Sequence, residues 1–113
     1  MKKETIVIAG KEYRVEANWN ALVAFLQVVG RDTIEDLVNF EIIPPSEMAA
    51  LMVACIVEGE RLEGRECTLT VLDLGAVITP HDVATFLEIY ARQSAPKMEV
   101  DEPKKETREE PAP

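Results

Sequence analysis

The sequence predicts a mainly α (α+β) fold, in which an N-terminal β-hairpin packs on a compact bundle of four to five helices. Three observations support this prediction. Apolar, β-branched residues flank a glycine within residues 4–17, which is typical of a hairpin. From there to about residue 95, apolar residues recur at helical spacing between capping residues. Residues 96–113 hold ten charged residues and four prolines, which favours a disordered tail.

The predicted hairpin has strands at about residues 4–9 and 12–17. The dipeptide Gly10-Lys11 between them suits a two-residue turn, because glycine adopts a positive φ at no steric cost. This turn would pair Ile8 with Tyr13 and Ile6 with Val15, and it would place all four on one apolar face. A lone hairpin is unstable in water, so the helices must cover that face.

Two helices are expected next. Asn18 is a candidate N-cap and Gly30 a candidate C-terminal cap of a first helix. A capping box that begins at Asp32 predicts a second, short helix. The residues that these two helices would bury are Leu22, Phe25, Leu26 and Val29 in the first, and Ile34, Leu37 and Val38 in the second.

A third helix is predicted over residues 46–58, with Gly59 at its end and a charged, solvated loop over 59–67. It is apolar on nearly every side, which is typical of a central helix. Thr70 and Thr79 each precede an acidic residue by three positions, which predicts N-caps for helices at 71–77 and 80–94. The residues that the last helix would bury are Val83, Phe86, Leu87 and Tyr90. Residues 1–95 would thus form one domain.

Charge and composition exclude several classes of function. The 113 residues include 21 acidic and 12 basic ones, for a formal charge of −9. Nucleic acids and anionic membranes bind through Lys and Arg, so protein partners are expected instead. No segment has the ~20 apolar residues of a membrane span, and the start, Met1-Lys2-Lys3-Glu4, does not resemble a signal peptide. A cytoplasmic location is therefore expected.

No catalytic, cofactor or metal site is predicted. His81 is the only histidine, Cys55 and Cys67 are twelve residues apart, and both thiols are expected to be reduced. The acidic residues around Gly59 are interleaved with arginines, which favours a solvated loop over a rigid pair of catalytic carboxylates.

Three residues are candidates for binding a partner. Trp19 is either an anchor for a partner or a lid over the apolar face of the hairpin, and the lid is the favoured interpretation. Met48 and Met52 belong either to an adaptable contact surface or to the ordinary core, and the core is favoured.

The order of these elements resembles that of the small tail assembly chaperones of long-tailed phages, prophages and gene transfer agents. The resemblance covers about residues 4–93, from the hairpin with Ile6, Gly10 and Tyr13 to the helix with Leu22 and Phe25 and the helices beyond. It implies a non-enzymatic protein that binds the tape measure protein and helps to recruit tail tube subunits. It also implies that a longer, frameshifted form is made in some relatives.

The sequence leaves two other functions open. A small acidic adaptor, inhibitor or antitoxin would bind a basic protein partner through its charge. A small enzyme is the least supported of the three, because no catalytic constellation is found in the sequence.

Overall fold

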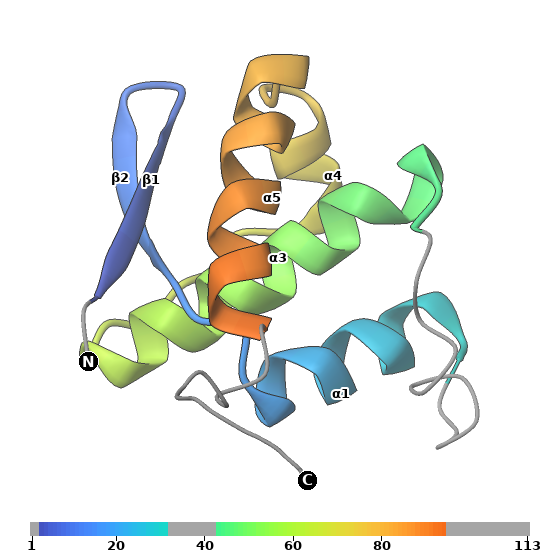
Figure 1. Ribbon diagram of the computed structural model, residues 1–113, viewed down its shortest axis with the longest axis horizontal. Helices are drawn as coiled ribbons and strands as arrows, with labels where there is room; N and C mark the ends of the chain where they lie inside the picture. The colour runs from blue at the N-terminus through green and yellow to red at the C-terminus, as the bar shows by residue number, and fades with distance from the viewer. Residues whose placement is uncertain (1–2, 32–42, 95–113) are drawn as a thin grey trace, which may run out of the picture.

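The computed structural model describes residues 3–31 and 43–94 and confirms the predicted fold class. Figure 1 shows an antiparallel two-stranded hairpin and the helices that surround it. The elements are β1 (Glu4–Ile8), β2 (Lys11–Val15), α1 (Trp19–Val29), α3 (Pro45–Leu62), α4 (Val71–Gly75) and α5 (Pro80–Ser94). The short helix expected from Asp32 and the tail expected over 96–113 lie outside the described residues.

The hairpin forms, but its predicted register is wrong. Ile8 pairs with Lys11 and Ile6 with Tyr13, so the turn is Ala9-Gly10. Ala9 and Gly10 have φ values of 51° and 82°, and two consecutive positive φ angles define the turn that best matches the twist of a hairpin. The error amounts to a shift of two residues. Because side chains alternate with a period of two, the apolar face is the one predicted, although the pairs across it differ.

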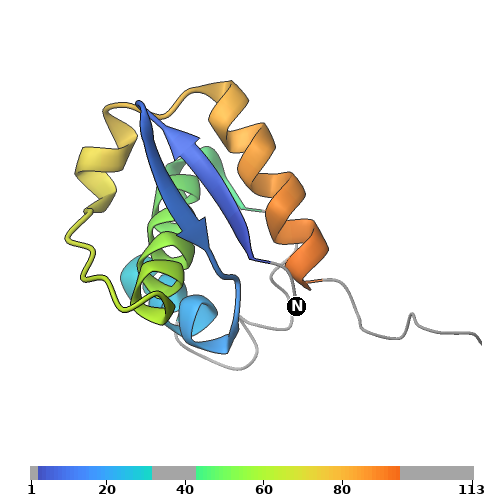
Figure 2. The ribbon, with the colours of Figure 1, turned by 90° about the vertical axis from the view of Figure 1, so that its left-hand side faces the viewer.

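α3 is the central element, as its sequence predicts. It contacts α1, β2 and α4, and α5 packs on β1. Figure 2 shows the hairpin in front of α3 with α5 beside it. The apolar face of the hairpin is therefore covered by α3 and α5. Its buried members are Ile6, Ile8 and Val15.

The boundary predicted for α3 is wrong. The helix continues through Gly59 to Leu62, so residues 59–62 are helical and not the start of a loop. α4 is shorter than predicted and ends at Gly75. In α5, Leu87 is exposed and Ile89 is buried, which reverses one predicted core position.

The caps predicted at Asn18, Gly30, Thr70 and Thr79 are confirmed. The side chain of Asn18 accepts a hydrogen bond from the Ala21 amide at 3.0 Å, and Gly30 ends α1 with a φ of 79°. Thr70 accepts from the Asp73 amide at 3.0 Å. At the start of α5 the exchange is reciprocal: Thr79 accepts from the Asp82 amide at 3.2 Å, and Asp82 accepts from the Thr79 amide at 3.0 Å.

Candidate partner-binding groove

An uncharged surface runs along the contact between α1 and α3. α1 contains no acidic or basic residue, and neither does the stretch of α3 from Met48 to Val57. The two helices run antiparallel, because Asn20 near the start of α1 contacts Glu58 near the end of α3. Alanines at 24, 50 and 54 leave a furrow, since their side chains do not fill the space between the helix axes.

This furrow is an open groove of about 180 Å³. It is lined by Asn20, Ala24 and Val28 from α1, by Ala50, Val53, Ala54, Val57 and Glu58 from α3, and by Val71 from α4. Val28, on its rim, is 63% exposed, which is high for an aliphatic side chain in a helix. Isolated exposed apolar residues are common, but a continuous apolar groove marks a candidate site of interaction.

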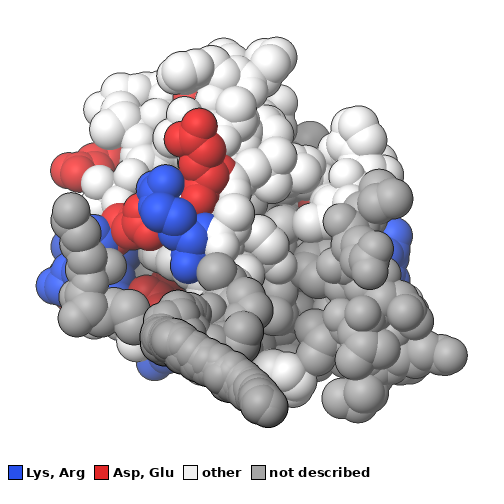
Figure 3. All heavy atoms as spheres, in the orientation of Figure 1, with Lys and Arg blue, Asp and Glu red and all other residues white. Residues whose placement is uncertain are grey.

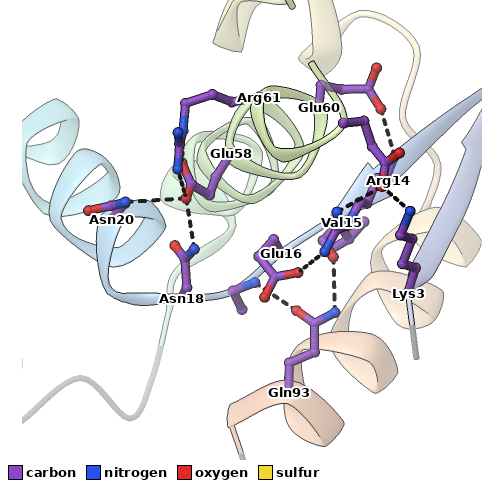
Figure 4. A network of polar contacts seen from close by, with 12 residues as sticks. Lys3, Arg14, Val15, Glu16, Asn18, Asn20, Glu58, Glu60, Arg61 and Gln93 are labelled. Carbon is purple, nitrogen blue, oxygen red and sulfur yellow. Dashed lines mark hydrogen bonds and ion pairs between the residues drawn. The ribbon is translucent and has the colours of Figure 1, made fainter. Parts of the chain in front are cut away.

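One end of the groove is closed by a buried carboxylate, that of Glu58. It accepts hydrogen bonds from Asn18 Nδ2 at 2.7 Å and from Asn20 Nδ2 at 3.3 Å. Arg61 completes the cluster with Nε and Nη2 at 2.9 and 2.8 Å. Figure 4 shows these side chains converging on the Glu58 carboxylate. Hydrogen bonding by Arg61, followed by that of Asn18 and Asn20, outweighs the effect of burial and lowers the pKa of Glu58 to about 2.

A further ion pair links the end of α1 to the start of α3. Arg31 follows the last turn of α1, and its Nη2 lies 2.9 Å from Oε1 of Glu47 in the first turn of α3. The carboxylate near the start of a helix is favoured by the helix dipole.

A second polar cluster attaches the hairpin to α3. Oε2 of Glu60 accepts from the Arg14 amide at 2.9 Å, and both oxygens accept from Arg65 at 2.7 and 2.9 Å. These bonds, those from Arg65 above all, lower the pKa of Glu60 to about 2. The side chain of Arg14 contacts Glu63 at 2.7 Å and Glu16 at 3.0 Å.

Neither cluster is predicted from the sequence, where the glycine and the interleaved charges favour a solvated loop. Glu58 and Glu60 are each only 6% exposed. A signal was present in the sequence: Glu58 and Arg61 are three residues apart, which is the spacing of an ion pair on a continuing helix. Gly59, between the two acids, is however typical of a helix end, and this pattern hides the spacing.

Gln93 ties the end of α5 to the link between β2 and α1. Its Nε2 donates to the carbonyl of Val15 at 2.9 Å, and its Oε1 accepts from the amide of Ala17 at 2.7 Å. The side-chain amide thus pairs with a main-chain carbonyl and a main-chain amide, as the backbone of a neighbouring strand would, and Figure 4 shows this pairing. It fixes the point at which the hairpin leads into α1.

The three residues predicted to bind a partner have different positions. Trp19 is 58% exposed at the start of α1, so it is not a lid over the hairpin, and it does not line the groove. Met52 is fully buried in the core, and Met48 is half-buried against it, which agrees with the favoured interpretation. The face of α3 that borders the groove presents Val53 and Val57 instead.

The histidine and the two cysteines, which are the residue types most often found in catalytic and metal sites, do not line the groove. His81 is exposed at the start of α5. Cys55 and Cys67 are free thiols, the first buried and the second half-buried. Burial, with a smaller effect from Glu16, raises the pKa of the Cys55 thiol to about 12. Within residues 3–31 and 43–94, no group of three His, Cys, Asp or Glu side chains is placed to hold a metal ion.

Charged side chains are grouped on one face of the molecule. On the face shown in Figure 3, acidic and basic side chains gather over the hairpin and the adjoining part of α5. One of the pairs on these elements is Arg92 with Glu4, at 2.6 Å. In the part of the chain that the structure describes, no helix is long and apolar enough to cross a membrane.

Comparisons with known proteins give no relative. No protein-family model matches the sequence, and no curated protein or solved structure is significantly similar to it.

Proposed function

We propose that this chain is a non-enzymatic tail assembly chaperone of the phage type, which binds a tape measure protein and helps to recruit tail tube subunits. The proposal begins from the resemblance in the order of elements. The observation that carries it on the structural side is the largely apolar groove between α1 and α3, in whose lining Glu58 is the one charged residue. A tape measure protein is long and helical, and its apolar stripes need cover until the tail assembles.

The rest of the chain suits a carrier of such a client. A formal charge of −9 keeps a protein soluble and self-repelling. α1 and the stretch of α3 from Met48 to Val57 hold no charged residue. An apolar client bound there would leave water at little cost in polar desolvation, because Glu58, the charged residue of the groove lining, is already buried.

The alternative of an acidic adaptor for a basic partner has less support. Many carboxylates of the described residues already pair with a cation of the same chain. They are Glu4, Glu16, Glu47, Glu58, Glu60 and Glu63. A carboxylate that already pairs with an arginine attracts a basic partner less strongly than a free one does.

The test is co-expression with a client. The gene's neighbourhood supplies the candidate, which is a very long, helix-rich protein encoded downstream of a tail tube protein. We expect the soluble fraction of this client to rise when the chain is present. Ala24→Gln, which fills the groove, should abolish the effect. Ala84→Gln is the matched control, because Ala84 is exposed on α5 and does not line the groove. A client that is equally insoluble with and without the chain would refute the proposed function.

A further inference from the structure

We propose that the outer edge of β1 binds an extended segment of another protein, which joins the hairpin as a third, antiparallel strand and carries a basic residue. The inference concerns a surface that the proposed function does not use, so it is independent of the groove between α1 and α3. It rests on a difference between the two edges of the hairpin.

The outer edge of β2 is closed by α3. The main-chain amide of Arg14 donates to Glu60 at 2.9 Å, and that of Glu16 donates to the Cys55 carbonyl at 3.0 Å. Gly59 approaches the Arg14 carbonyl so closely that a β-carbon at this position would collide with it. α3 therefore occupies the side of β2 on which a further strand would otherwise pair.

The outer edge of β1 receives no such cover from the described residues. Across the hairpin, Thr5 pairs with Arg14 and Val7 with Glu12. The Arg14 amide points outward to Glu60, so Thr5 and Arg14 are a pair without hydrogen bonds to one another, and such pairs alternate with bonded ones. The amides and carbonyls of Thr5 and Val7 therefore point away from β2. None of the described residues forms a hydrogen bond with them.

The sequence of β1 does not block this edge. Natural edge strands carry lysine, proline or a bulge, which prevent another strand from pairing. In β1, Thr5 and Val7 are uncharged and β-branched, and the pairing with β2 is regular throughout the strand. Val7 is also 58% exposed. An uncharged strand of high β propensity, with a free row of donors and acceptors, is the kind of edge to which an extended segment adds.

The outer face of the hairpin favours a basic residue in the added strand. The Glu12 carboxylate accepts from the Thr5 hydroxyl at 2.8 Å, so it leans across β1 toward the free edge. A lysine opposite Val7 would cover that side chain with its methylene stem and bring its ammonium group to Glu12. The cations that line the same pocket as Glu12 are already paired with other carboxylates of the described residues, and they are Lys3, Arg14 and Arg65.

A second copy of the chain does not suit this edge. α5 packs on β1, and Figures 1 and 2 show it beyond β1, on the side away from β2. Two copies joined at their β1 edges would bring both α5 helices to the same face of the joined sheet, next to the two-fold axis. Each copy also has a formal charge of −9, so the copies repel one another. An extended segment brings no helix with it.

The probe is a fluorescein-labelled peptide in which valine and lysine alternate with threonine, and two N-methylated forms of it test the main-chain bonds. In an antiparallel pairing, the residues opposite Thr5 and Val7 direct their amides at β1. Methyl groups on the valine and lysine amides should therefore weaken binding at least about tenfold in fluorescence anisotropy. Methyl groups on the threonine amides, which face away from β1, should leave the affinity unchanged.

Protein variants locate the binding edge. Val7→Pro removes an outward amide, and the ladder between β1 and β2 does not use this amide. We expect it to weaken binding of the unmethylated peptide at least about tenfold, whereas Val7→Thr, which keeps the amide, should change the affinity less than about twofold. Glu12→Gln should weaken binding about threefold. Its matched control, Glu66→Gln, removes the same charge from an exposed site in the segment before α4 and should have no such effect.

Several results would overturn the inference. They are no binding of the unmethylated peptide, equal binding of the two methylated forms, and wild-type affinity in a folded Val7→Pro variant. Self-association of the wild type that Val7→Pro abolishes would also overturn it, because a second copy would then occupy the edge. If thermal melts show that Val7→Pro disturbs the hairpin, the methylated peptides decide, since they leave the protein unchanged. Unchanged affinity in Glu12→Gln would overturn the assignment of the basic residue.

Discussion

The α-carbon of Gly59 in α3 lies directly against the backbone of Arg14 in β2. A β-carbon built at Gly59 would contact the Arg14 carbonyl oxygen, and it would lie 2.6 Å from the carbonyl carbon and 3.0 Å from the Val15 amide nitrogen. This close approach allows two hydrogen bonds between the hairpin and α3. Arg14 donates its amide to Glu60 at 2.9 Å, and Glu16 donates its amide to the Cys55 carbonyl at 3.0 Å. Gly59 is therefore required by packing and not by a turn.

The first prediction is that Gly59→Ala is strongly destabilising. The atoms in its way belong to the backbone, so the hairpin must move away from α3. We expect a loss of about 3 kcal/mol in the free energy of unfolding, measured by urea denaturation. Gly75→Ala is the control, because nothing lies within 4 Å of its added β-carbon. A Gly59→Ala variant as stable as the control would show that the hairpin does not pack there.

Gly59 also shows why part of the fold could not be predicted from the sequence. Glycine at the end of an apolar helical run is typical of a C-terminal cap. The local pattern alone cannot distinguish such a cap from a glycine that lets another segment of main chain pack closely against the helix. The difference lies in Arg14, which is 45 positions away in the chain. The caps at Asn18, Thr70 and Thr79 were predictable, because the side chain and the amide that it binds are three residues apart.

The groove was less predictable than the core. Its lining comes from three separate helices. α3 is apolar on nearly every side, so the sequence does not show which of its sides is left uncovered by the other elements. Methionine is typical of adaptable contact surfaces, yet Met52 is fully buried. The open side presents alanine and valine, residues that are unremarkable in a sequence.

The second prediction concerns the turn of the hairpin. Ala9 has a φ of 51°, which costs an L-residue with a β-carbon about 1 kcal/mol. Asparagine tolerates this conformation, and Asn-Gly is the preferred pair for such a turn. We expect Ala9→Asn to stabilise the protein by up to about 1 kcal/mol in urea denaturation. Lys11→Asn tests the other register. Asparagine would stabilise the protein if the turn were Gly10-Lys11. Because residue 11 instead pairs with Ile8 in a strand, we expect Lys11→Asn to give no gain in stability.

The third prediction is that the two cysteines react at very different rates. Cys55 is fully buried and its pKa is raised to about 12, so almost no thiolate is present at pH 8. Cys67 is half-buried, outside the helices. A thiol reagent such as DTNB should modify one cysteine quickly and the second only after unfolding in urea. Cys67→Ser should remove the fast reaction, and two equal rates in the wild type would contradict the buried position of Cys55.

The fourth prediction is a loss of stability in acid that depends on Glu58 and Glu60. Hydrogen bonds from Arg61 and Arg65, respectively, lower both pKa values from an ordinary value of 4.5 to about 2 in the folded chain. The unfolded chain therefore takes up protons first as the pH falls, and protons favour unfolding. The stability that these two carboxylates contribute is complete above about pH 5 and declines as the pH falls from there toward 2.

Urea midpoints measured across that range should fall, and they should fall less steeply in Glu58→Gln, which has one such group fewer. Glu88→Gln, which changes an exposed carboxylate on α5, should follow the wild-type curve. If the Glu58→Gln curve ran parallel to the wild-type curve, the Glu58 carboxylate would not be held by Arg61 and the two asparagines in solution, and the groove would lack its proposed polar end.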